Sequence, residues 1–212
     1  MKPRFSNLGL LIAAVVLASG CASQPNRYYT LTTPAGLSAN AAPASETAPV
    51  FIELAPIAVP ERLARPQIVL TPTGGGSAVV QLLEQHRWTS SLENELRDAL
   101  ASGIVSRLDA IDVSRGGRPQ HQPAWRIAVQ LRQFDAVENT RVDAAFSWTL
   151  RRSDADRSAA CQWSASETVG NGIDALAQGA QRVTDKAANA ITRHLTAVRD
   201  GNIDAACRFI PP

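Results

Sequence analysis

The residues that could carry out chemistry in this chain of 212 residues are few and widely spaced. Its three histidines are His86, His121 and His194, and no two of them have the H-x-x-x-H spacing of a zinc site. His194 lies in a late segment of helical periodicity without a second ligand nearby, so we expect a solvated or helix-capping role for it. The histidines therefore predict no metal centre.

Acid–base and nucleophilic motifs are also missing from the sequence. No G-x-S-x-G segment indicates a serine nucleophile. Asp154 and Asp156 share the string RRSDADRS, whose carboxylates could bind calcium weakly, but the string lacks further ligands and carries three arginines. We interpret it as a solvated turn, and Glu84 and His86 as polar groups between a strand and a helix. The sequence thus favours a non-catalytic binding or structural protein that uses no cofactor.

Cys21 follows a segment typical of a secretory signal. Lys2 and Arg4 give a positive start, and Leu8 to Leu17 form an apolar core of about ten residues. A permanent transmembrane helix needs about 20 apolar residues, so this segment is too short to be one. The run is apolar without alternation, which argues against a buried amphipathic helix.

Ala18-Ser19-Gly20-Cys21 resembles the lipobox of bacterial lipoproteins, although Leu17 stands one position earlier than the leucine that a lipobox prefers. The resemblance implies that residues 1–20 are removed and that Cys21 becomes an acylated N-terminus. Several acyl chains would anchor it firmly to a membrane, since each buried methylene contributes about 0.8 kcal/mol. Ala22 rather than aspartate follows the cysteine, which resembles sorting to the periplasmic face of the outer membrane.

Cleavage would also change the net charge. The whole chain has 21 Lys+Arg and 19 Asp+Glu, and Lys2 and Arg4 leave with the signal. The mature chain is then formally neutral, so its charge gives no support for binding nucleic acid.

Cys161 and Cys207 are the cysteines that remain after lipidation of Cys21. A secreted protein can form a disulfide between them, and the alternative is a pair of small buried thiols. The sequence leaves both open, because a bond requires their Cα atoms to lie within about 7 Å.

Hydrophobic periodicity predicts the elements that position these residues. Residues 22–26 read as a polar tether, and residues 33–49, rich in Ala, Pro, Ser and Thr, as a flexible loop. Strands are expected at 27–32, 50–55, 67–71, 77–83 and 111–114, the third and fourth forming a hairpin around the glycines of 73–76.

The later part of the chain has the clearest patterns. Alternation predicts a three-stranded antiparallel meander over residues 125–169. Helices are expected at 87–108, with a capping box from Ser90 to Glu93, and at 173–198, with Asn171 as N-cap. The second helix has an alanine-rich seam that suits close packing on its own sheet better than a coiled coil with a partner.

The predicted fold class is therefore α+β, a single domain whose antiparallel or mixed sheet is packed by two long helices. Residues 1–20 are the signal peptide, and residues 21–49 contain the lipidated cysteine, the tether, the first strand and the flexible loop. The main domain covers residues 50–212 and includes the strand at 27–32.

Three segments resemble the ABC-type transport auxiliary lipoprotein family, which includes PqiC-like proteins. They are RYYTL at 27–31, PERLARPQIVL at 60–70 and HRWTSSLENELRDAL at 86–100. The family pattern is carried by Arg65-Pro66-Gln67-Ile68-Val69 and by Arg87-Trp88. The pattern predicts that Arg87-Trp88 opens the first helix. One position departs from it, since Val59 replaces the usual leucine before Pro60.

The resemblance implies a periplasmic lipoprotein without catalytic activity. Such proteins are auxiliary components of intermembrane lipid transport, and their partners are an MCE-domain protein and inner-membrane transporter components. PqiC-like members are thought to form a homo-oligomeric ring, which needs a head-to-tail interface that closes by rotation.

Arg65, Pro66, Gln67, Arg87 and Trp88 are our candidates for a partner interface, because arginine and tryptophan are enriched at the centres of interfaces. The alternative for Trp88 is a core position, and for Arg65 a pairing with a nearby carboxylate. The other functions that remain open are an envelope-assembly lipoprotein that activates a peptidoglycan synthase and a periplasmic hydrolase.

Overall fold

A computed structural model of the protein describes residues 25–33, 49–72, 79–202 and 207. The predicted signal peptide and Cys21 lie outside the described residues. So do residues 34–48 of the predicted flexible loop and the glycine-rich turn at 73–76. Within the described part, no helix combines the length and the apolar character needed to cross a membrane.

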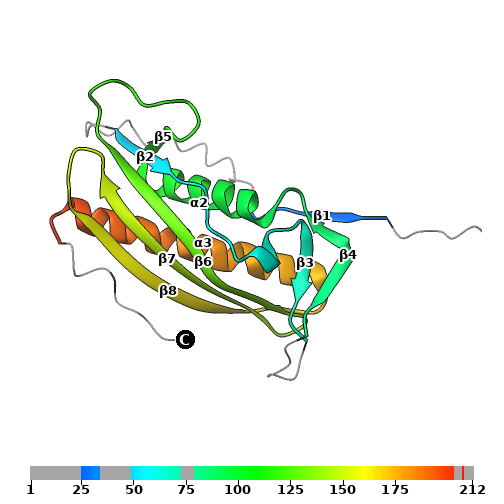
Figure 1. The fold of residues 1–212 in the computed structure, drawn as a ribbon. Helices are drawn as coiled ribbons and strands as arrows, with labels where there is room; N and C mark the ends of the chain where they lie inside the picture. The colour runs from blue at the N-terminus through cyan, green and yellow to red at the C-terminus, as the bar shows by residue number, and fades with distance from the viewer. Residues whose placement is uncertain (1–24, 34–48, 73–78, 203–206, 208–212) are drawn as a thin grey trace, which may run out of the picture.

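The described residues form eight strands, one 3-10 turn and two α-helices (Figure 1). In chain order they are β1 (Arg27–Tyr29), β2 (Val50–Leu54), η1 (Glu61–Leu63), β3 (Gln67–Leu70), β4 (Gln81–Trp88), α2 (Leu92–Leu108), β5 (Ala110–Asp112), β6 (Ala124–Val137), β7 (Arg141–Arg152), β8 (Ser158–Thr168) and α3 (Gly172–Arg199).

The larger sheet has the strand order β5-β2-β6-β7-β8. β6, β7 and β8 are antiparallel, which confirms the predicted meander, and β2 lies parallel to both β5 and β6. Trp148 of β7 stands opposite Val129 of β6 and Cys161 of β8, so alternate residues of the three strands share one buried face.

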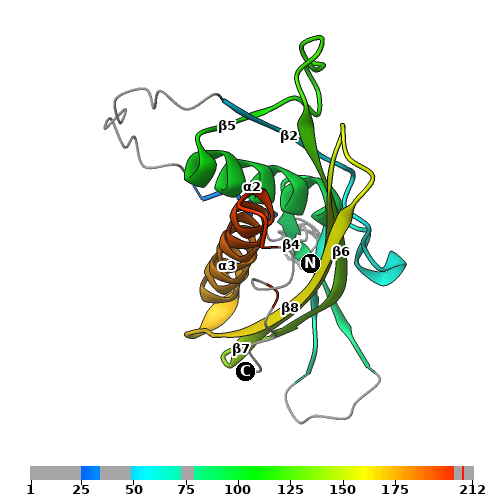
Figure 2. The same cartoon turned by 90° about the vertical axis from the view of Figure 1, so that its left-hand side faces the viewer.

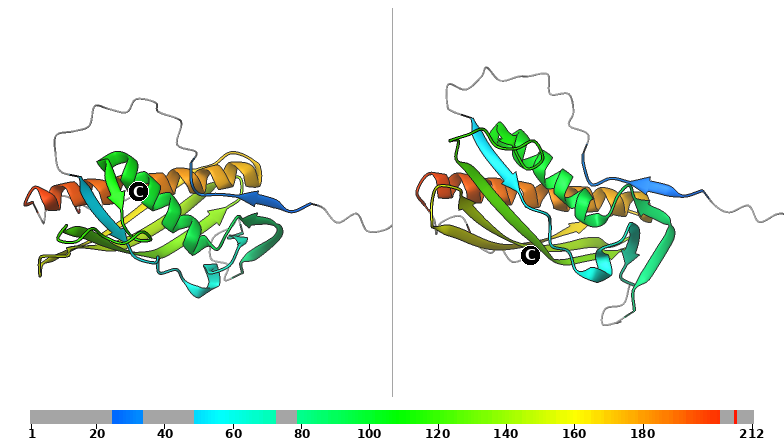
Figure 3. Two further views of the ribbon diagram at one scale, coloured as in Figure 1. Left: turned by 90° about the horizontal axis from the view of Figure 1, so that it is seen from above. Right: turned by 45° about the horizontal axis from the view of Figure 1, so that its top comes forward.

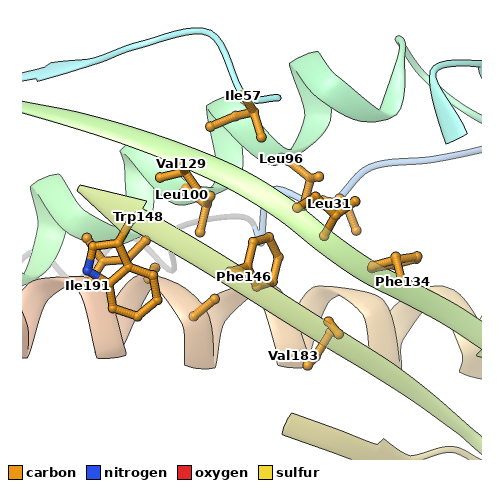
Figure 4. Close-up of a cluster of buried hydrophobic side chains, with 14 of the residues drawn as sticks. Leu31, Ile57, Leu96, Leu100, Val129, Phe134, Phe146, Trp148, Val183 and Ile191 are labelled. Carbon is orange, nitrogen blue, oxygen red and sulfur yellow. The ribbon is translucent and has the colours of Figure 1, made fainter. Parts of the chain in front are cut away.

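Both helices cover the concave face of this sheet (Figure 2). The core lies between the sheet and the two helices, and it contains Phe146, Trp148, Leu96, Leu100, Val183 and Ile191 (Figure 4). The small residues of α3 permit a close approach, since a Cβ atom at Gly179 would lie 2.2 Å from Val169 Cγ1. The helix therefore packs on the sheet of its own domain, as the alanine-rich seam predicts.

The smaller sheet has the order β1-β4-β3. β3 and β4 form the predicted hairpin, whereas β1 pairs with β4 in parallel. The predicted boundary between strand and helix is wrong: β4 continues to Trp88, and α2 begins only at Leu92. Ser91 rather than Ser90 is the N-cap, and its side chain accepts a hydrogen bond from the Asn94 amide at 3.4 Å.

α3 begins where the sequence predicts but is capped differently. Asn171 occupies the N-cap position without a capping hydrogen bond from its side chain. Asn139, in the β6–β7 turn at a φ of 57°, instead accepts a hydrogen bond from the Gly172 amide at 2.7 Å through its Oδ1. The molecule is thus a single-domain α+β fold with two mixed sheets, in agreement with the predicted fold class.

Candidate functional site

The two segments proposed as a partner interface lie side by side on β3 and β4. The amide of Trp88 donates a hydrogen bond to the carbonyl of Pro66 at 2.7 Å, and Gln67 stands opposite Arg87 in the hairpin. The residues Arg65, Pro66, Gln67 and Arg87, hereafter the hairpin patch, form one continuous piece of chain surface. Residues about 20 positions apart in the sequence are therefore brought together, as the interface hypothesis requires.

The four residues of the hairpin patch are open to solvent, but Trp88 is not. Pro66 is exposed, and Arg65, Gln67 and Arg87 are half-buried. Trp88 is only 4% exposed and belongs to the main core. Trp88 therefore does not open a helix and does not face a partner; it supports the patch from beneath.

The two arginines of the patch differ in how they are held. Arg87 donates to the carbonyl of Glu84 at 2.8 Å and contacts the Glu84 carboxylate at 3.5 Å. Arg65 makes no ion pair with the described residues, so the carboxylate partner weighed from the sequence is not found there. Its Nε is buried and lacks a hydrogen-bond partner in the described part of the chain. An unpaired guanidinium can pair with a carboxylate of another protein.

The buried carboxylate of Glu95 joins three segments of the chain. Glu95 of α2 is 5% exposed and accepts hydrogen bonds from Thr30 Oγ1 and the Leu31 amide, each at 2.9 Å. It also accepts bonds from Thr89 Oγ1 and, at 2.9 Å, from Ser90 Oγ. The end of β1, the turn after β4 and the first turn of α2 are thereby fixed to one another.

The environment of Glu95 favours its ionised form. Burial by itself would raise the pKa of the carboxyl, but the hydrogen bonds from Thr89, Leu31, Thr30 and Ser90 outweigh burial and lower the pKa below 4.5. The sequence analysis missed this residue. Its signal is an acidic residue three positions after Leu92, on the apolar face of the helix, preceded by the hydroxyl residues at 89–91.

A second polar cluster joins β1 to β4 and to the first turn of α3. The Tyr29 hydroxyl donates to Asp174 Oδ1 at 2.7 Å and lies 2.9 Å from His86 Nδ1, and the rings of Tyr29 and His86 stack at 5.8 Å. Arg27 contacts the same Asp174 carboxylate at 3.4 Å. Since the tyrosine proton is given to the carboxylate, His86 Nδ1 is the donor to the hydroxyl oxygen.

This cluster keeps the Tyr29 hydroxyl in its protonated form. Burial raises the pKa of Tyr29, and the hydrogen bond and negative charge of Asp174 raise it further, so the phenol stays protonated. A protonated phenol is a poor base and nucleophile. Because Tyr29 belongs to the RYYTL segment, the cluster gives this sequence motif a structural role: it holds β1 on the domain.

His194 occupies a different environment from the one predicted. It is 1% exposed, in the core between α3 and β7, and accepts a hydrogen bond from Trp148 Nε1 at 2.9 Å through its Nδ1. It is neither solvated nor a helix cap. Burial lowers its pKa below 6.5, so the neutral imidazole is favoured in the folded protein.

Cys161 of β8 and Cys207 are joined by a disulfide bond in the structure, with Cα atoms 5.4 Å apart. The bond attaches the segment after α3 to an edge strand of the larger sheet. In the described part of the chain, no three His, Cys, Asp or Glu side chains are grouped as metal ligands. Asp154, weighed as a calcium ligand, instead pairs with Arg152 at 2.9 Å.

The fold and these clusters define an α+β domain whose polar side chains hold its elements together, with the hairpin patch at its surface. A family model described as the ABC-type transport auxiliary lipoprotein component matches residues 29–192. The chain belongs to this family of auxiliary lipoproteins, as the RYYTL, RPQIV and RW segments predict.

Solved structures share the fold at low sequence identity. A crystal structure of a protein described only as uncharacterized has a TM-score of 0.64 and 16% identity over 81% of this chain and 99% of its own. A DUF330 protein from Xanthomonas campestris has a TM-score of 0.59 and 13% identity over 82% of this chain and 98% of its own. These similarities support the fold alone. No protein with a curated description matches this chain.

Proposed function

We propose that this protein is a non-catalytic lipoprotein, anchored by acylated Cys21 at the periplasmic face of the outer membrane. In this role it assists an ABC-type system that moves lipid between the membranes, with an MCE-domain protein and the inner-membrane transporter components as partners. The observation that carries the proposal is the family match over residues 29–192, directly behind the lipobox cysteine.

The arrangement of β1 supports an anchor at Cys21. Residues 22–26 separate the cysteine from β1, and Tyr29, Thr30 and Leu31 are all bonded to the domain. The anchor would therefore enter the fold at the first turn of α3, and the domain would be held close to the membrane at that end. β1 projects from the domain at this same end (Figure 3).

The hairpin patch supplies the surface for a protein partner. Arg65, just before β3, and Arg87 of β4 bring two guanidinium groups to this patch, and bidentate pairing with carboxylates gives arginine both affinity and geometric specificity. We propose that a neighbouring copy in a ring or the MCE-domain protein binds here.

The test of the function is a crosslinking pull-down of the tagged lipoprotein from cell envelopes, with partners identified by mass spectrometry. We expect MCE-domain and ABC-transporter subunits among the crosslinked proteins. A Cys21→Ser variant should lose acylation and membrane fractionation. Recovery of peptidoglycan synthases in place of transporter subunits would contradict the proposal and favour the envelope-assembly function.

The test of the hairpin patch uses the same pull-down. An Arg65→Ala/Arg87→Ala variant should lose most of the crosslinked partner and keep its fold, because neither side chain belongs to the hydrophobic core. The matched control is Arg132→Ala, an exposed arginine on the outer face of β6. Equal recovery of partner by the double variant and the control would refute the patch.

A further inference from the structure

A cavity of about 440 Å³ opens at the end of the domain that lies opposite β1. It is lined by the start of β2, the start of β6, the β7–β8 turn and the last turn of α3. Its volume falls within the range of roughly 300–1,000 Å³ that is usual for small-molecule sites. In Figure 1 this end contains the C-terminal turn of α3, drawn in red.

Apolar side chains form part of the cavity wall, beside polar ones such as Gln122 and Ser158. Val50 and Phe51 of β2, Trp125 of β6, Ala159 of β8 and Val198 of α3 contribute to it. An indole, a phenyl ring and aliphatic side chains offer contact to one hydrocarbon chain or ring system, and burying such a group is favourable by about 25 cal/mol per Å².

The rim of the cavity is cationic. Arg152, Arg157 and Arg199 line it, and no acidic residue does. Asp154 pairs with Arg152, whereas the side chains of Arg157 and Arg199 make no ion pair or hydrogen bond with the described residues. Two exposed guanidinium groups beside apolar side chains fit a molecule with an anionic head and an apolar body.

Part of the positive charge at the rim comes from the last turn of α3. Helix C-terminal carbonyls carry partial negative charge, which Arg199 offsets from its place in the last turn. Arg157 belongs to the β7–β8 turn, which lines the same cavity as the last turn of α3. The cationic rim is therefore assembled from two elements of the fold.

The position of the cavity relative to β1 is set by α3. Asp174, which holds Tyr29, and Val198, which lines the cavity, are 24 residues apart on one helix. At 1.5 Å per residue they are separated by about 36 Å. On the anchoring proposed above, the cavity faces away from the outer membrane.

We propose that this cavity binds a single-chain anionic amphiphile, with the chain against Phe51 and Trp125 and the phosphate or carboxylate head on Arg157 and Arg199. The inference goes beyond the proposed function, which assigns the protein only protein partners and an acyl anchor. It rests on that function solely for its biological context.

The test uses the lipid-free mature chain beginning at residue 22, which retains the whole core between Leu31 and Leu195. Dodecyl phosphate, below its micelle concentration, is titrated calorimetrically into the wild type, Arg157→Gln/Arg199→Gln and the control Arg132→Gln. We expect saturable binding to the wild type and the control, and binding at least about tenfold weaker in the double variant, as expected for lost charge-assisted contacts.

Two further ligands separate the contributions of head and chain. Inorganic phosphate should bind far more weakly than dodecyl phosphate, and so should the neutral dodecyl maltoside. A bromine-labelled fatty acid should quench tryptophan fluorescence in the wild type and much less in Trp125→Phe. Val198→Trp, which fills the cavity from α3, should abolish binding while the circular dichroism spectrum is retained.

Absence of dodecyl phosphate binding, equal binding to the double variant, or equal binding of inorganic phosphate would each overturn the inference. Because no transporter subunit is present in these titrations, such a result leaves the pull-down test of the proposed function untouched. Absence of transporter subunits from the wild-type pull-down, together with intact amphiphile binding, would overturn the function and leave the cavity site standing.

Discussion

Glu95 provides the sharpest test of how this fold is held together. Its carboxylate receives four hydrogen bonds, from Thr30, Leu31, Thr89 and Ser90, and hydrogen bonds to a charged group contribute about 1.5–3 kcal/mol each in net terms. In Glu95→Ala the hydroxyl donors can turn to other acceptors, but the buried Leu31 amide cannot. We expect the free energy of unfolding to fall by about 3–5 kcal/mol.

Glu95→Gln should cost much less. The amide oxygen can accept from Leu31 and Thr30, and the amide NH₂ can donate to the hydroxyls of Thr89 and Ser90, which reverse their roles. Only the charge assistance is lost, so we expect about 1–2 kcal/mol. The matched control is Glu93→Gln, which removes the same charge from the same helical turn and should change stability by no more than about 0.5 kcal/mol.

The measurement is urea unfolding of the lipid-free mature chain followed by tryptophan fluorescence, repeated at several pH values. Because the folded-state pKa of Glu95 is lowered, its contribution is present above the usual carboxyl pKa of 4.5 and is lost as pH falls through the folded value. The difference between wild type and Glu95→Gln should therefore shrink below pH 4.5. Equal stabilities for the alanine, glutamine and Glu93 variants would refute the reasoning.

Three other variants test separate parts of the fold. Cys207→Ser should lower the free energy of unfolding by roughly 2–4 kcal/mol, since it opens a covalent loop, and the difference should vanish under reducing conditions. Gly179→Ala should cost about 1–3 kcal/mol because its methyl would meet Val169, whereas Gly116→Ala, with no atom within 4 Å, should be nearly neutral in the same unfolding assay. Burial lowers the pKa of His194, so its contribution to stability is present above pH 6.5 and is lost as pH falls through the folded value. His194→Phe should therefore lose less stability than the wild type as pH falls below 6.5, and an equal loss in both proteins would contradict the assignment.

The sequence predicts the elements of this fold best where one face of an element is fully buried. β6 and β7 alternate because one side packs on the helices and the other meets water, and α3 shows its seam for the same reason. β4 has no such signal. Half of its residues are exposed and only Trp88 is buried, and Leu82 and Leu83 are adjacent rather than alternate.

The candidate site was predictable in part for a related reason. Arg65 and Arg87 could be grouped from the family pattern, but the burial of Trp88 depends on where β4 ends relative to the core, which no local pattern specifies. The contacts of Glu95 with Thr30 and Leu31, and of Tyr29 with His86, join residues more than 50 positions apart, and they depend on the parallel pairing that places β1 beside β4. Parallel pairing leaves no turn signal in the sequence.

The parallel pairing of β1 also determines how the domain would carry a mechanical load. A pull along β1 towards an anchored Cys21 acts in shear, so the pairs of Arg27, Tyr28 and Tyr29 with β4 resist it together rather than one after another. Asp174 passes part of the load to α3, and Glu95 passes part to α2. A load on the proposed anchor would thus be shared between β4 and the two helices rather than borne by β1 alone.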